Sequence, residues 1–177
     1  SSRLYSGLTE QGFRRSGSHI YKPHCVNCNK CIPIRLNVSS FKANKTQRRV
    51  LKQNSDLECR IEKTEFTSAS YKLFERYIEA RHKDGDMYPA TEDQFKSFLL
   101  SPWANTRSLN FYLDGDLVSS AVTDLQLRSI SAIYTFFEPD HSDRSLGTLS
   151  ILKQIQLASS MNLKHVYLGY WIKESAK

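Results

Sequence analysis

Residues 109–122 read Leu-Asn-Phe-Tyr-Leu-Asp-Gly-Asp-Leu-Val-Ser-Ser-Ala-Val. Two runs of strand-favouring residues, Leu109–Leu113 and Leu117–Val122, flank the triplet Asp114-Gly115-Asp116. Glycine accepts a positive φ at no steric cost, so Asp-Gly between two such runs is typical of a tight hairpin turn. The segment therefore predicts a pair of antiparallel strands.

Helices are predicted on both sides of this hairpin. Before it, four residues recur at helical spacing, with Ser68 or Ser70 as the candidate N-cap: Tyr71, Phe74, Ile78 and Arg81. Thr91-Glu92-Asp93-Gln94 is a capping-box pattern and predicts the start of a second helix. After the hairpin, a third helix is indicated by Leu149, Leu152 and Ile155.

Strands complete the predicted fold. Alternating residues indicate them at 34–38, 57–66, 131–137 and 166–172. From Leu57 onward the order is strand, helix, helix, three strands, helix, strand. This order favours an α+β fold, with a mostly antiparallel sheet flanked by helices. Residues 1–34 are rich in Gly, Ser, Cys and Pro, and we expect loops and short strands there.

Positive charge is concentrated in one segment. Between Glu10 and Asp56 lie ten Lys or Arg and no acidic residue, whereas the rest of the chain holds fifteen basic against eighteen acidic residues. The net charge of +7 is therefore a local patch, and nucleic acid is the usual partner of such a patch. The densest basic run, which a solvated helix face would also explain, is Lys42, Lys45, Arg48, Arg49 and Lys52.

Three of the four cysteines form the triplet Cys25-x-x-Cys28-x-x-Cys31. This spacing occurs in iron–sulfur sites, which need a fourth ligand; His24, Cys59 or a cysteine outside this chain are the candidates. Zinc binding and reduced free thiols are the alternatives. So tight a repeat suits metal chemistry better than a secreted disulfide framework. With no apolar run long enough for a membrane span and no signal-peptide core, we expect a cytoplasmic protein without a membrane partner.

Seven short motifs point to one known family. They are Phe13-Arg14-Arg15-Ser16-Gly17, Tyr21-Lys22-Pro23-His24-Cys25, Pro33-Ile34-Arg35, Thr46-Gln47-Arg48-Arg49-Val50-Leu51, Tyr134-Thr135-Phe136-Phe137-Glu138-Pro139, Ser145-Leu146-Gly147-Thr148 and Tyr167-Leu168-Gly169-Tyr170-Trp171-Ile172. Together they resemble the aminoacyl-tRNA–protein transferases, and among these the bacterial aspartate/glutamate leucyltransferases, which are related to the arginyltransferases. The resemblance runs from about Tyr5 to the end of the chain.

This resemblance implies an activity and a fold. The activity is transfer of leucine from leucyl-tRNA to proteins that begin with Asp or Glu, which marks them for N-degron degradation. The fold is a GNAT-like acyltransferase region at 57–177, preceded by a basic, cysteine-containing region at 1–56, the two packed as one unit. Aminolysis of an activated ester requires no cofactor, so an iron–sulfur cluster or zinc would be structural or redox-active.

The resemblance also implies site residues. Tyr134, Glu138, Tyr167 and Tyr170 are the catalytic candidates, although tyrosines in strands more often serve packing. Cations in the motifs are candidates for binding the acceptor's acidic side chain: Arg14, Arg15, Lys22 and Arg35. The basic run 42–52 is the expected tRNA phosphate contact, because a tRNA is recognised largely by shape and backbone.

Three other functions fit part of the sequence. An arginyl-tRNA-dependent transferase of the same family would have the same mechanism. A CoA-dependent GNAT acetyltransferase is disfavoured, because Leu149 stands where the pyrophosphate loop begun by Arg144 needs a small residue, and we expect no CoA. A non-enzymatic, metal-containing nucleic-acid-binding protein explains the basic patch and the cysteines but not the acyltransferase-like half.

Overall fold

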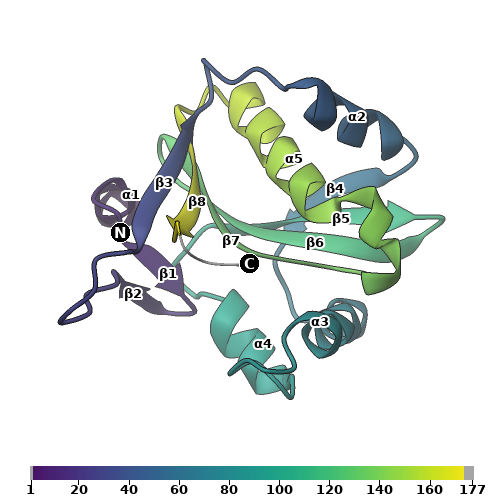
Figure 1. Cartoon of the computed structure of the whole chain (residues 1–177), viewed down its shortest axis with the longest axis horizontal. Coiled ribbons are helices and arrows are strands. Elements are labelled where there is room, and N and C mark those ends of the chain that lie inside the picture. Colours follow the sequence, from purple (N-terminus) through teal and green to yellow (C-terminus); the bar gives the residue numbers. More distant parts are fainter. Residues whose placement is uncertain (1, 174–177) are drawn as a thin grey trace.

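A computed structural model describes residues 2–173, which form a six-stranded sheet with helices on both faces (Figure 1). The strand order is β3-β8-β7-β6-β5-β4. In chain order the bounds are β3 Ile32–Asn37, β4 Glu58–Lys63, β5 Thr106–Leu113, β6 Asp116–Leu125, β7 Ser129–Phe137 and β8 His165–Trp171. Only β7 and β8 run parallel; all other neighbours are antiparallel. The predicted α+β class with a mostly antiparallel sheet is confirmed.

The hairpin β5–β6 forms where the sequence predicts it. Asp114 and Gly115 both have positive φ, 51° and 92°, as a two-residue turn between right-twisted strands requires. Alternation along β5 sends Leu109 and Phe111 to one face, and both are at most 1% exposed.

Two layers of helices cover the two faces of the sheet. Helices α2 (Lys45–Gln53) and α5 (Leu146–Ser160) lie on one face, where Val50 and Leu149 pack with Leu109 and Phe111. Helices α3 (Ser68–Arg81) and α4 (Glu92–Leu99) cover the other face. The core between these helices and the sheet consists of Leu73, Phe74, Ile78, Phe95, Leu99, Val122 and Phe136. A 3₁₀ helix, η1 (Pro139–Arg144), leads from β7 into α5.

Side-chain caps fix the starts of α3 and α4. Thr91 and Gln94 form the predicted capping box of α4. For α3 the expectation of Ser68 or Ser70 as the N-cap is wrong: the cap is Thr67, whose hydroxyl accepts from the Ser70 N–H, and Ser70 reaches back to the Thr67 N–H. Ser70 is therefore the partner of the cap.

The N-terminal segment differs most from expectation. Residues Ser2–Glu10 form a helix, α1, where loops and short strands are predicted. Tertiary contacts hold this helix, because Tyr5 and Thr9 are buried against the sheet. After α1 come the short hairpin strands β1 (Arg14–Ser16) and β2 (His19–Tyr21), and then β3, which pairs with β8. Part of the segment before Asp56 thus lies in the same sheet as the rest of the chain.

Strands β7 and β8 pair only between Ser129–Ser131 and His165–Tyr167. Beyond these pairs β8 continues alongside β3 alone, as far as the pair Trp171–Ile32. In Figure 1, α1 and the β1–β2 hairpin lie next to this β3–β8 edge.

Candidate active site

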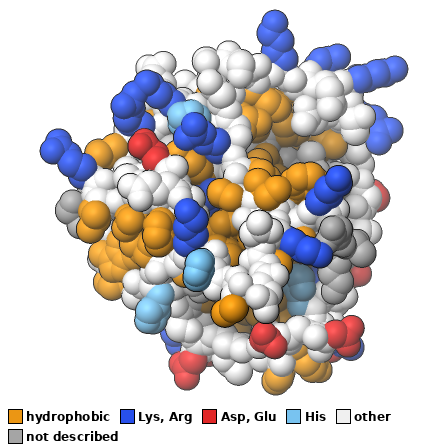
Figure 2. Space-filling view, turned by 60° about the vertical axis from the view of Figure 1, so that its left-hand side comes forward, with side chains coloured by type: hydrophobic (Ala, Val, Ile, Leu, Met, Phe, Trp, Pro, Cys, Tyr) orange, Lys and Arg blue, Asp and Glu red, His pale blue; other side chains and the backbone are white. Residues whose placement is uncertain are grey.

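A pocket of about 260 Å³ opens between α1, β1, β3 and β8. Glu10, Arg14, Arg35 and Tyr167 contribute its charged and aromatic lining, and Gly12, Pro33 and Ile34 contribute its backbone and apolar lining. Figure 2 views the molecule with this end turned forward; Lys and Arg side chains gather over its upper part, and acidic ones lie mainly along the lower edge. The charged lining of the pocket itself is two arginines, Arg14 and Arg35, against one carboxylate, Glu10.

Arg14 is the most unusual side chain of this pocket. It is 4% exposed, and its guanidinium carbon lies 4.9 Å from the ring centre of Tyr167 and 5.7 Å from that of Tyr170. Its Nη1 donates to the carbonyls of Phe13 (2.7 Å) and Thr9 (3.3 Å), while its buried Nε has no hydrogen-bond partner. Burial lowers the pKa of Arg14 from its usual 12.5, because desolvation disfavours the charged form. Within residues 2–173 no carboxylate is paired with this buried cation.

Arg35 and Tyr167 line the pocket with Arg14, and Tyr170 contacts Arg14 and Gly12 of its wall. Arg35 Nη1 lies 3.5 Å from the hydroxyl of Tyr167, to which it donates. Tyr170 donates its hydroxyl proton to the Gly12 carbonyl at 2.6 Å. Gly12 itself has φ of 92°, and an added Cβ would lie 3.2 Å from Pro33 Cγ, so the chain needs glycine here. The structure thus brings together four of the predicted site residues: Arg14, Arg35, Tyr167 and Tyr170.

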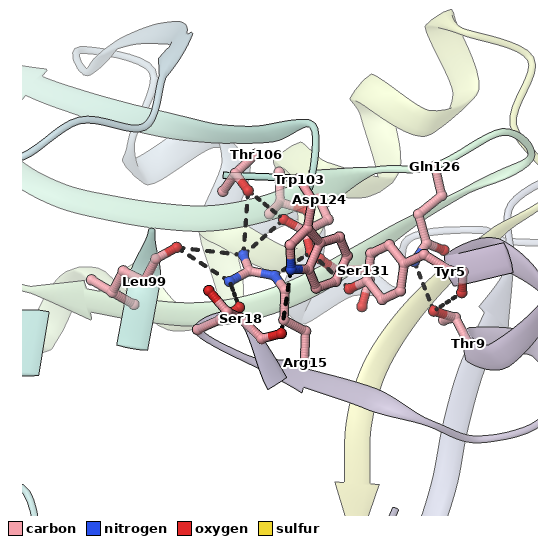
Figure 3. Close-up of polar contacts among 12 residues, drawn as sticks. Tyr5, Thr9, Arg15, Ser18, Leu99, Trp103, Thr106, Asp124, Gln126 and Ser131 are labelled. Atoms are coloured by element: carbon pink, nitrogen blue, oxygen red, sulfur yellow. Dashed lines mark hydrogen bonds and ion pairs between the residues drawn. The ribbon is translucent and has the colours of Figure 1, made fainter. Parts of the chain in front are cut away.

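The prediction for Arg15 needs correction. Its side chain is 0% exposed, and its guanidinium donates to Asp124 through Nε (2.7 Å) and Nη2 (2.8 Å), with further bonds to Thr106 and to the carbonyls of Leu99 and Gly17 (Figure 3). Because its donors are used inside the protein, Arg15 has none left for an acceptor carboxylate. Arg15 is a structural residue.

Lys22 lies outside the pocket. Its exposed ammonium donates to the Gln11 carbonyl at 3.0 Å and lies 5.7 Å from the Phe13 ring centre. The side chain lies near the pocket mouth, since Gln11 belongs to the pocket wall.

Tyr134 and Glu138 lie apart from Tyr167 and Tyr170. The ring of Tyr134 packs against Phe98 of α4 at 5.2 Å and Phe74 of α3 at 6.2 Å, and its buried hydroxyl has no partner. Burial raises the pKa of Tyr134 far above 10. Glu138 forms a two-point pair with Arg76 of α3, with Nη2–Oε2 of 2.6 Å. No hydrogen bond or ring contact joins either residue to the arginine pocket in the part of the chain described.

Helix α2 carries four of the five cations of the basic run, and Lys42 precedes it. Lys45 begins α2, and the whole run is exposed: Lys42, Lys45, Arg48, Arg49 and Lys52. Helix α2 packs on α5, on the sheet face opposite α3 and α4. The run is therefore a separate surface from the arginine pocket.

The cysteine triplet lies in the loop between β2 and β3. Cys25 and Cys28 are exposed, Cys31 is half-buried, and all three thiols are free. Among the described residues no three His, Cys, Asp or Glu side chains are grouped to hold a metal ion. As placed, the thiols do not fit a zinc or cluster site, so we derive no reaction step through such a group, and metal binding stays a prediction.

Glu10, Asp124 and His165 were not among the predicted site residues. Asp124 could have been suspected, because it is an acidic residue next to the strand-favouring run that ends at Val122. Glu10 and His165 carry no local signal. The packing of α1 brings Glu10 to the same pocket as Arg35, and the pairing of β8 with β3 brings His165 near Arg35. Desolvation lowers the pKa of His165 from 6.5, and the nearby Arg35 lowers it further.

Comparisons with known proteins agree along the whole chain. Residues 1–49 match the family model for the N terminus of arginine-tRNA-protein transferase, and residues 69–177 match the model for its C terminus. An aspartate/glutamate leucyltransferase from Marinobacter nauticus is 51% identical over 175 residues, which are 99% of this chain and 74% of that protein.

Solved structures share the fold at low sequence identity. The C-terminal domain of a putative lysylphosphatidylglycerol synthetase from Agrobacterium fabrum aligns with a TM-score of 0.60 and 12% identity, covering 96% of this chain and 52% of that one. The structure of L-PGS from Bacillus licheniformis aligns with a TM-score of 0.60 and 9% identity, covering 99% and 52%. No helix among the described residues is long and apolar enough to cross a bilayer.

Proposed function

The chain belongs to the arginine-tRNA-protein transferase family, and from that premise we propose that it transfers leucine from leucyl-tRNA to the α-amine of proteins that begin with Asp or Glu. The family predicted from the seven motifs is confirmed by the matching family models and by the relative at 51% identity. The product carries an N-terminal leucine, which marks it for N-degron degradation in the cytoplasm, where charged tRNA is made.

The reaction is the aminolysis of an ester. The acceptor's α-amine attacks the leucyl carbonyl carbon, a C–N bond forms, and the C–O bond to the tRNA 3′-oxygen breaks. One proton leaves the amine and one is taken up by the departing oxygen. Because the ester is already activated, positioning of the two substrates supplies much of the rate, and no cofactor is needed for the balance.

The proposed acceptor site rests on one observation: Arg14 is buried and has no carboxylate partner among the described residues. A guanidinium removed from water without a counter-ion is costly, and a bound carboxylate offsets that cost. Its free Nε faces no protein acceptor, and Arg35 adds a second positive charge to the same pocket. We assign the side-chain carboxylate of the N-terminal Asp or Glu to Arg14 and Arg35.

The tyrosines of β8 are suited to proton delivery. Since Tyr167 accepts from Arg35, its own O–H proton must point away from that guanidinium. A hydroxyl so oriented can protonate the leaving 3′-oxygen, as general-acid catalysis requires. Tyr170 is committed to the Gly12 carbonyl, and we give it the role of holding the pocket's backbone and the Arg14 side chain.

The basic face of α2 is the proposed contact for the tRNA backbone. Its four exposed cations and Lys42, which precedes the helix, form no ion pair within residues 2–173, so they are available to phosphates. Such a surface provides affinity and salt dependence without reading base sequence.

CoA has no place in this proposal. Arg144, at the start of the loop that would hold a diphosphate, is paired with Asp56 at 3.0 Å through both terminal nitrogens. Leu149 is 0% exposed in the core beneath α5, so it cannot move aside for a ligand at low cost.

Transfer assays test the activity. Peptides beginning with Asp, Glu or Ala are incubated with labelled leucyl-tRNA, arginyl-tRNA or acetyl-CoA. We expect leucine on the Asp and Glu peptides alone. Arginine transfer would correct the donor, and acetyl transfer or no transfer would overturn the assignment.

Substitution of Arg14 tests the acceptor site. Arg14→Gln should raise KM for the Asp peptide by about 10- to 100-fold, the value of a hydrogen bond to a charged group, and leave tRNA affinity unchanged. Arg60→Gln is the matched control, because Arg60 is exposed and paired with Glu58 at the far edge of the sheet. An Arg14→Gln protein with wild-type KM would refute this placement of the acceptor.

A further inference from the structure

A cluster of polar side chains lies on the sheet face beneath α3, where a helix-covered face is ordinarily apolar. Glu62 comes from β4, Asn110 and Tyr112 from β5, and Ser120 from β6. The three strands are neighbours, and Asn110 is the direct partner of Ser120 in the ladder. Nothing in the transfer reaction uses these residues.

Hydrogen bonds hold the Glu62 carboxylate in one orientation. Its Oε2 accepts from Asn110 Nδ2 at 2.6 Å and from the Tyr112 hydroxyl at 3.1 Å. Ser120 in turn donates to Asn110 Oδ1 at 2.8 Å, which fixes the amide. Both protein donors reach the same oxygen, and Oε1 has no hydrogen bond to any described residue. The carboxylate is thus held in a fixed orientation with one oxygen, Oε1, available to bind a cation.

The carboxylate borders a cavity of about 340 Å³. This volume is within the range of about 300–1,000 Å³ that is usual for small-molecule sites. Phe95, Val122 and Phe136, each 1% exposed, line its floor, and small side chains such as Ser108 leave the space open. Lys63 and the first turn of α3 lie at the edge of the same cavity. Glu65, which also lines the cavity, pairs with Lys63 at 3.1 Å, so the lining presents the Glu62 carboxylate, an apolar floor and an ion pair at the rim.

We propose that this cavity binds a free amino acid with an aliphatic side chain. Glu62 Oε1 holds the α-ammonium, and Phe95, Val122 and Phe136 contact the side chain. The α-carboxylate lies at the rim, where it takes the place of Glu65 beside Lys63. An acidic amino acid is rejected, because its second carboxylate would meet Glu62 or the apolar floor.

The cavity is a second site, separate from the arginine pocket. In the sheet, β8 and β5 are separated by β7 and β6, so three strand spacings, about 14 Å, lie between their axes. A ligand beneath α3 therefore lies too far from Arg14 to react with an acceptor held there.

Calorimetric titration of the whole chain with leucine tests the proposal. Leucine should bind, whereas 4-methylpentanoate, which lacks the ammonium, and aspartate should not. Glu62→Gln should weaken leucine binding by about tenfold or more, since it removes a charge-assisted hydrogen bond. Glu58→Gln, on the same strand but exposed and paired with Arg60, should bind as the wild type does.

Three results would overturn the proposal. They are absence of leucine binding, equal binding by the Glu62→Gln protein, and binding of leucinamide that leucyl-tRNA displaces, which would make the cavity the donor's leucyl subsite. Ala69→Leu, at an exposed helical position on the cavity wall, gives a second variant that should fold normally and block binding. The titration needs neither tRNA nor transfer, so its failure is distinct from failure of the proposed activity.

Discussion

Replacing Asp124 by Asn should destabilise the protein strongly. The Asp124 carboxylate is 0% exposed and accepts four hydrogen bonds: from Tyr5 (2.7 Å), from Thr106 (2.7 Å) and from Arg15 (2.7 and 2.8 Å). It therefore joins α1, β1, β5 and β6 at one point (Figure 3). The substitution keeps the shape of the side chain and removes its charge.

The size of this loss of stability depends on Arg15, the cation that Asp124 neutralises. Arg15 is fully buried, so without Asp124 it becomes an uncompensated charge, and breaking such a pair costs about 3–5 kcal/mol. The Asn amide also places an N–H donor among groups that themselves donate, those of Tyr5, Arg15 and Thr106. For a chain of 177 residues each kcal/mol lowers Tm by about 2–4 °C, so we expect a fall of about 6–20 °C.

Urea unfolding followed by circular dichroism measures this change, with Asp116→Asn, an exposed position at the start of the same strand, as the control. The control should change stability by less than about 0.5 kcal/mol. The double variant Arg15→Met/Asp124→Leu should lose less stability than Asp124→Asn, because it leaves no buried charge. A loss below about 1 kcal/mol for Asp124→Asn would refute the reasoning.

Two further predictions concern RNA binding and pH. Changing Lys45, Arg48, Arg49 and Lys52 together to Gln should weaken tRNA binding and reduce the slope of log affinity against log salt by about 3. The control Arg60→Gln/Lys83→Gln, on exposed cations already paired with Glu58 and Glu79, should not. The pKa of His165 is lowered by burial and then by Arg35, so an NMR titration should find its midpoint below 6.5, and Arg35→Gln should raise it. Because the unfolded chain then binds the extra proton, stability should fall as pH drops through about 6.5, and less so in His165→Gln.

Local signals predicted those elements whose conformation is decided within a few residues. The Asp114-Gly115 turn forms because both residues tolerate positive φ, and α4 begins at Thr91 because its hydroxyl and Gln94 satisfy the first N–H groups. Helix α1 had no such signal. It is stabilised by bonds over more than a hundred residues, from Tyr5 to Asp124 and from Gln126 to Thr9.

The sequence by itself determined the family, the α+β class, the hairpin and the single basic segment, because these depend on residue order and short-range spacing. Only the tertiary structure decided the different roles of Arg14 and Arg15, two arginines adjacent in one motif: Arg15 forms a buried ion pair and Arg14 lines the pocket. Successive side chains of a strand point to opposite sides, so Arg15 meets Asp124 while Arg14 enters the pocket with no carboxylate. Which side holds the counter-ion depends on the position of β6 in the sheet, and no spacing along the chain encodes that position.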